Sequence, residues 1–104
     1  MDTFFALTTL NIDGEYRSRL VGCFPDFESA LKCVLENHLD IYEEGWYPYA
    51  VIEKLDWGLY PNSIANRWFY QWQGAVKGRP VEPSEGYVAC DPLPGSERLI
   101  SYFG

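Results

Sequence analysis

The sequence predicts a single α+β domain, residues 1–104, in which an antiparallel or mixed sheet carries one amphipathic helix on one face. Three observations predict it. Segments rich in aromatic and β-branched residues recur along the chain, one segment has the apolar spacing of a helix, and an Asp-Gly pair joins the first two strand-like segments. A chain of 104 residues is too short for two cores. The predicted order is β-β-α-β-β, followed by an irregular C-terminal third.

The first two strands form a predicted hairpin. Thr3–Leu10 is rich in the aromatic and β-branched residues that favour strands. Asp13-Gly14 marks the turn, because glycine accepts the positive φ that tight turns require. Tyr16–Phe24 is the expected return strand, and Pro25 ends it.

A helix is predicted directly after this hairpin. Asp26 is expected to cap it by accepting a hydrogen bond from a free backbone N–H. The apolar residues that follow have the i, i+3, i+4, i+7, i+8 spacing of one helical face: Phe27, Ala30, Leu31, Val34 and Leu35. The charged residues Glu28, Lys32 and Glu36 share the far face. We expect the helix to end near Asn37 or His38.

Two more strands are predicted in the second half of the chain, at Tyr49–Leu55 and Arg67–Gln73. The segments between and after them carry glycine and proline and are expected to be loops: 56–66 and 74–86. Two short apolar runs near the end, Tyr87–Cys90 and Leu99–Phe103, are either edge strands or tails packed on the core.

The net charge of the chain is -7, which disfavours direct binding to nucleic acid and to anionic membranes, because both attract positive charge. Most of the negative charge lies in one segment. Six acidic residues occur from Glu36 to Asp56, against the single base Lys54. A local field of one sign speeds the encounter with an oppositely charged partner.

We therefore interpret this acidic segment as a docking surface for a protein with a basic surface. The predicted partner-binding residues are Asp40, Glu43, Glu44, Trp46, Glu53, Asp56 and Trp57. Two other interpretations stay open: a solvated loop that aids solubility, and a Ca²⁺ or Mg²⁺ site in which Asp40, Glu43 and Glu44 surround His38. No EF-hand spacing is present.

Aromatic residues make up 17% of the chain, a high share that calls for an explanation. Trp68, Tyr70 and Trp72 alternate in the fourth predicted strand and so share one face. They either form a second small core under the long loops or remain available at an interface, where Trp and Tyr are enriched.

No sequence motif indicates catalysis. The chain has one histidine, His38, at the expected end of the helix, where it interacts with the last carbonyls more often than it acts as a base. Nucleophile-elbow and phosphate-loop motifs are missing from the sequence. We expect no enzymatic activity, no cofactor and no metal.

The expected location is the cytoplasm. The first residues, MDTFFALTTL, lack the basic region of a signal peptide, and no apolar stretch is long enough to span a bilayer. Cys23, Cys33 and Cys90 are odd in number and widely spaced, which favours free thiols in a reducing compartment.

Two segments carry a resemblance: YPYAVIEKLDWGLYP (Tyr47–Pro61) and the helix start FPDFESA (Phe24–Ala30). Both resemble small uncharacterised bacterial and phage-borne α+β proteins. The resemblance supports the fold class and brings no known activity, so it implies no catalytic or binding residue.

The function expected from these observations is that of a non-enzymatic, acidic protein-binding module. By analogy of composition it is an inhibitor that occupies a basic, nucleic-acid-binding surface of its partner, as anti-CRISPR proteins and nuclease immunity proteins do. The alternative is a small enzyme or ligand-binding protein with its site at the aromatic loops.

Overall fold

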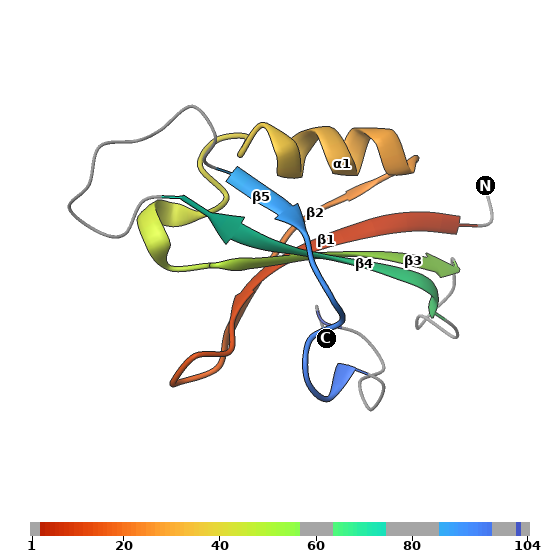
Figure 1. The fold of residues 1–104 in the computed structure, drawn as a ribbon. Helices are drawn as coiled ribbons and strands as arrows, with labels where there is room; N and C mark the ends of the chain where they lie inside the picture. The colour runs from red at the N-terminus through yellow and green to blue at the C-terminus, as the bar shows by residue number, and fades with distance from the viewer. Residues whose placement is uncertain (1–2, 57–63, 75–85, 97–101, 103–104) are drawn as a thin grey trace.

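The computed structural model describes residues 3–56, 64–74, 86–96 and 102, which form one antiparallel sheet and one α-helix. The strands are β1 (Thr3–Asn11), β2 (Arg17–Phe24), β3 (Tyr49–Asp56), β4 (Ile64–Gln73) and β5 (Gly86–Ala89). The helix α1 (Phe27–Leu35) follows β2, and a 3₁₀ turn, η1 (Glu43–Gly45), precedes β3. Across the sheet the order is β2-β1-β3-β4-β5, so β2 and β5 are the edge strands (Figure 1).

The predicted α+β class is confirmed. Tyr87–Cys90, for which the sequence predicts either an edge strand or a packed tail, lies largely in the edge strand β5, which pairs with β4 and follows the predicted β-β-α-β-β order. The hairpin between β1 and β2 turns where Asp13-Gly14 predicts it. Gly14 has a φ of 87°, and the Asp13 N–H donates to Asn11 Oδ1 at 2.8 Å.

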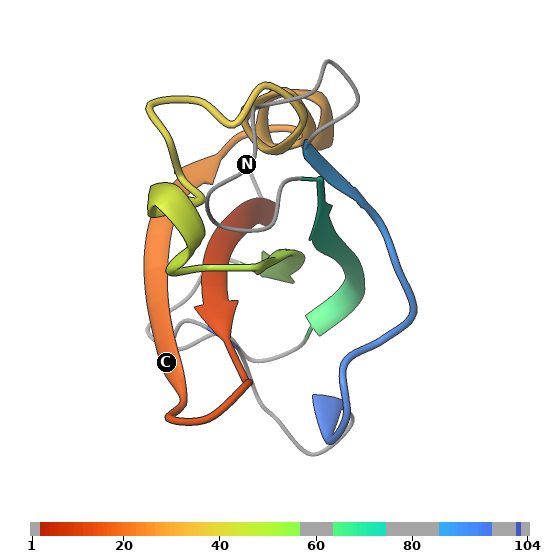
Figure 2. The ribbon, with the colours of Figure 1, turned by 60° about the vertical axis from the view of Figure 1, so that its left-hand side comes forward.

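One face of the sheet packs against α1, which lies above the strands between the two edges in Figure 2. Its buried residues come from four strands and the helix: Leu7, Ala50, Ile52, Tyr70, Tyr87, Ala30, Cys33 and Val34. Trp68 and Trp72 pack against this cluster, and the Trp72 ring stacks on Tyr42 at 3.9 Å. The Trp68, Tyr70 and Trp72 rings therefore belong to the helix-side core.

The opposite face of the sheet is also covered. Leu10, Val51 and Phe69 form a buried cluster there with two residues that follow β5, Leu93 and Tyr102. Both faces of the central strands are therefore buried, which explains the uninterrupted apolar run Ala50–Ile52 in β3.

The described cysteines, Cys23, Cys33 and Cys90, are free thiols, as their spacing predicts. Within the described ranges no helix has the length and apolar character needed to cross a membrane.

Candidate protein-binding surface

The segment between α1 and β3, residues 37–46, forms a compact turn that we call the acidic turn. Five of its non-glycine residues have φ between 46° and 53°: Asn37, Leu39, Asp40, Glu43 and Glu44. Side chains other than Gly, Asn and Asp rarely adopt this left-handed region, at a cost of about 1–2 kcal/mol per residue. Contacts elsewhere in the molecule must therefore hold the turn.

Hydrogen bonds within the acidic turn and a ring contact with β4 supply part of this support. Asn37 Oδ1 accepts the N–H of Tyr42 at 2.9 Å, and Asn37 Nδ2 donates to Asp40 Oδ1 at 3.2 Å. The Tyr42 ring, stacked on Trp72, also meets Tyr87 edge-on at 6.1 Å. The turn is thus anchored in the helix-side core.

Two arginines of β2 fasten the other side of the turn. Arg19 Nη1 lies 2.6 Å from Glu43 Oε2, and Arg19 Nη2 donates to the carbonyl of Ile41 at 3.5 Å. The Arg17 guanidinium lies 4.3 Å from the centre of the Trp46 ring, a cation–π contact. Arg17 and Arg19 are two residues apart on β2, so their side chains lie on the same face of the strand. Both side chains contact the acidic turn from this face.

The predicted binding residues of this turn therefore differ in their availability. Glu43 is paired with Arg19, and Trp46 has one ring face against Arg17. Asp40 and Glu44 are exposed, and neither forms an ion pair among the described residues. Three more exposed carboxylates without a described ion pair belong to α1 or its caps: Asp26 at the N-cap, Glu28 in the first turn and Glu36 at the C-cap. Lys32 is the basic residue of α1 on the same exposed part of the surface.

Glu53 must be removed from the predicted surface, because its side chain is fully buried on the face opposite α1. Arg67 Nε donates to Glu53 Oε2 at 2.8 Å, and the N–H of Tyr102 donates to Glu53 Oε1 at 2.9 Å. Burial raises the pKa of the Glu53 carboxyl, while these two hydrogen bonds and the Arg67 charge oppose the rise. Glu53 binds the chain's own arginine and not a partner.

Asp56 does not extend the acidic turn either. Asp56 ends β3, seven residues from Tyr49, and strand geometry places these two residues about 23 Å apart. Asp56 therefore lies at the other end of the sheet from Glu43 and Glu44. Trp57 lies outside the described residues.

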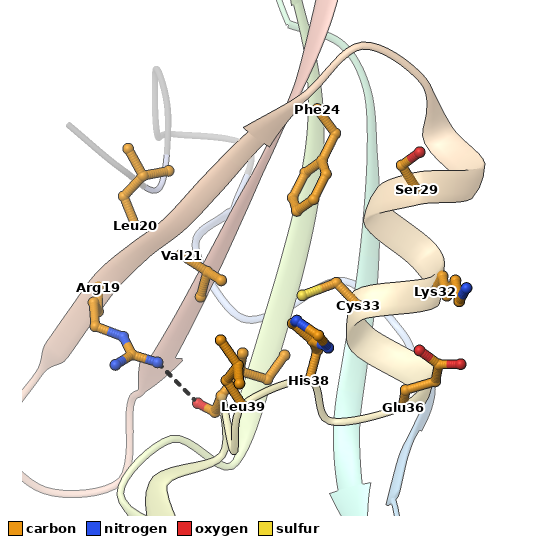
Figure 3. Close-up of a pocket in the computed structure, with 11 residues that line it drawn as sticks. Arg19, Leu20, Val21, Phe24, Ser29, Lys32, Cys33, Glu36, His38 and Leu39 are labelled. Carbon is orange, nitrogen blue, oxygen red and sulfur yellow. Dashed lines mark hydrogen bonds between the residues drawn. The ribbon is translucent and has the colours of Figure 1, made fainter.

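A groove of about 610 Å³ opens beside the acidic turn, between α1 and β2 (Figure 3). It was not predicted from the sequence. Val21, Phe24 and Cys33 give it apolar walls, and the polar residues Arg19, Glu36 and His38 also line it. Its helix residues have the spacing i, i+3, i+4, i+7, the signal of one common face: Ser29, Lys32, Cys33 and Glu36.

His38 lines this groove and does not assemble a metal site with the acidic turn. No cluster of three or more His, Cys, Asp or Glu side chains in the described part of the chain is able to hold a metal ion. Cys33, which also lines the groove, is not activated: burial raises the pKa of its thiol, and the Glu36 charge raises it further.

Comparisons of the chain with protein-family models, curated proteins and solved structures find no match. The resemblance of Tyr47–Pro61 to small bacterial and phage-borne proteins accordingly stays a prediction.

Proposed function

We propose that the protein is a non-enzymatic binding module whose acidic turn docks on a basic surface of a partner protein. One observation carries the proposal: the segment that presents Asp40 and Glu44 is held in a strained backbone conformation by β2 and β4 side chains. Left-handed conformations at non-glycine residues cluster at functional sites. A surface fixed before binding loses little conformational entropy when the partner arrives.

The charge of the surface favours a basic partner. Asp40 and Glu44 lie in the acidic turn, and Glu36 caps the end of α1 that precedes this turn, while the two β2 arginines face carboxylates or rings of the chain itself. Within this function we propose that the partner surface is one that binds nucleic acid, so that the module acts as an inhibitor in the manner of anti-CRISPR and immunity proteins. The support is charge alone, by analogy.

The test is capture from a lysate of the native host by immobilised wild-type protein and two matched variants. Glu44→Lys and Asp91→Lys each reverse one exposed carboxylate, at the acidic turn and beyond β5 respectively. A specific partner is retained by wild type and Asp91→Lys, is lost with Glu44→Lys, and is released at high salt. Retention of the same proteins by all three forms, whatever the salt, contradicts the proposal.

A competition experiment tests the inhibitor. Nucleic acid added to the captured partner should displace it from the wild-type protein if both occupy the same basic surface. A partner that binds nucleic acid and the module together contradicts the inhibitory role and leaves the docking role intact.

A further inference from the structure

The helix-side face of the sheet is wider than α1. Five strands spaced about 4.8 Å apart put the outer two about 19 Å from each other, whereas a helix with its side chains is about 10–12 Å across. The part of this face over β2 is where the groove opens. Figure 3 shows Val21 and Phe24 of β2 on one side of it and Cys33 of α1 on the other.

Leu39 is the most unusual residue of the groove. Its side chain is 89% exposed, and its backbone has a φ of 51°. Glycine or asparagine would occupy this conformation with less strain and would expose less apolar surface. Leu20 is also exposed, but it pairs with Thr8 and its side chain points away from α1, so it is not part of the groove's apolar contact surface. An exposed apolar side chain such as Leu39, beside the apolar walls formed by Val21 and Phe24, matches the anchor region of a protein interface.

The charges around the groove define the occupant further. Among the lining residues, Lys32 offsets the charge of Glu36, and Arg19 is neutralised by Glu43. The remaining charge comes from the exposed carboxylates of the acidic turn, Asp40, which directly follows Leu39, and Glu44. An apolar segment with basic residues beside it is the complement of this surface.

The edge of β2 argues for a helix and against an added strand. The register between β1 and β2 shifts at Leu7/Thr8, which leaves Val21 as an extra residue in β2. Bulges and charged side chains such as Arg17 and Arg19 are features that protect edge strands from pairing. A ligand that lies over the face of the sheet, next to α1, avoids the bulge. Amphipathic helices bind apolar grooves in this way.

We propose that the groove between α1 and β2 binds a short amphipathic helix of the partner, apolar on the face that enters the groove and basic beside it. The inference rests on the proposed function, since it assumes that one partner protein binds both the acidic turn and the groove. Leu39, Val21 and Phe24 are its apolar contacts, and Asp40 and Glu44 meet its basic residues.

The test uses two synthetic helical peptides of about 18 residues, long enough to form helix in water. Both place leucine at helical spacing, and the remaining positions are lysine in one and glutamate in the other. The leucine–lysine peptide should bind wild type, with amide chemical-shift changes at Val21, Cys33 and Leu39. The leucine–glutamate peptide should bind more than about tenfold more weakly.

Leu39→Gly tests the contribution of the groove to binding without changing the charge of the acidic turn. Glycine accepts a φ of 51°, so the variant should unfold at the same temperature as wild type or higher, and it should bind the leucine–lysine peptide more than about tenfold more weakly. Leu35→Ala is the matched control, because Leu35 is 57% exposed but does not line the groove. Its peptide affinity should equal that of wild type.

The possible failures are distinct. Equal affinity of Leu39→Gly and wild type, or shift changes confined to the outer backbone edge of β2, overturns the groove and leaves the proposed function standing. Equal affinity of the two peptides, together with no effect of Glu44→Lys on partner capture, overturns the proposed function as well. Absence of binding by either peptide overturns the inference.

Discussion

At the scale of single residues, Glu53 shows how a charged side chain can belong to the core. Its two carboxylate oxygens join three parts of the chain, because one accepts from Arg67 of β4 and the other from the backbone of Tyr102. Arg67 also donates to the carbonyl of Ser96, and its guanidinium lies 5.2 Å from the centre of the Tyr102 ring. Glu53 thereby ties the segment after β5 to the middle of the sheet.

Glu53→Ala should lower the free energy of unfolding by about 3–5 kcal/mol, because it leaves the 13% exposed Arg67 without its buried partner. Denaturant unfolding measures the change. Glu53→Gln, which keeps a hydrogen-bond acceptor, should lose less. Glu15→Ala is the control, since Glu15 is 84% exposed and 3.8 Å from Arg17, and its change should stay below about 0.5 kcal/mol. Equal midpoints for Glu53→Ala and Glu15→Ala would contradict this account.

The burial of Glu53 was predictable in part from the sequence. Strand alternation places it on the same face as Val51 and Leu55, both apolar. The acidic run from Glu36 to Asp56 instead favoured a surface position for Glu53. The net charge of a segment contains no information about which face of a strand each residue lies on. The prediction from net charge therefore assigned a core residue, Glu53, to the surface.

At the scale of elements, α1 was predictable at its start but less so in its orientation. Asp26 caps it as expected, with Oδ1 accepting the N–H of Ser29 at 2.8 Å. Burial is centred on Ala30, with Cys33 and Val34 beside it. Leu35 lies about 140° around the axis from Ala30 and is exposed. The apolar spacing identifies the helix, whereas its rotation depends on the sheet beneath it.

Val34→Ala and Leu35→Ala test this orientation at adjacent positions. Val34 is fully buried against the sheet, so its truncation should cost about 2 kcal/mol of unfolding free energy. Leu35→Ala should change stability by less than about 0.5 kcal/mol, because most of that side chain is in solvent. Chemical denaturation of both variants measures the difference. The reverse order of losses would mean that α1 is rotated from the position described.

The Asp26 cap should make stability depend on pH in acid. Hydrogen bonds from the backbone and side chain of Ser29 lower the pKa of Asp26 in the folded state. The stabilisation is therefore present above the pKa of an unfolded aspartate, about 3.9, and is lost as pH falls through the folded-state value. Asp26→Asn keeps a capping oxygen that does not titrate. Thermal unfolding of wild type should weaken more in acid than that of Asp26→Asn, and parallel pH profiles would refute the role of the cap.

At the scale of the whole molecule, local signals predicted more than non-local ones. The turn at Gly14, the helix cap at Asp26 and four of the strands follow from short stretches of sequence. The pairing of β5 with β4 and the groove beside α1 depend on contacts between distant segments. Patterns within one segment carry no information about which other segment will lie beside it.

The same distinction applies to the acidic turn. The sequence located its carboxylates, but not the β2 arginines that hold it, although Arg17 and Arg19 alternate on one face of a predicted strand. The six acidic residues of this run have different environments in the structure. Glu36, Asp40 and Glu44 are exposed, Glu43 pairs with Arg19, Glu53 is buried with Arg67, and Asp56 lies at the far end of β3.

This division of charge leads to a kinetic prediction for the captured partner. Exposed carboxylates act over distance, so Glu44→Lys should slow association several-fold and change dissociation less. Leu39→Gly should do the opposite, because an apolar contact forms only after the surfaces meet and its loss speeds dissociation. Asp91→Lys should affect neither rate strongly, since it lies beyond β5, at the sheet edge opposite β2.

Stopped-flow or surface-binding kinetics at two salt concentrations separate these effects. The screening length falls from about 10 Å at 0.1 M salt to about 3 Å at 1 M. Wild-type association should therefore slow at high salt until it approaches the rate of Glu44→Lys, whereas the faster dissociation of Leu39→Gly should persist at both concentrations. If wild-type association ignores salt, the exposed carboxylates of the acidic turn do not steer the partner. If dissociation of Leu39→Gly also matches wild type, neither the turn nor the groove is the contact surface.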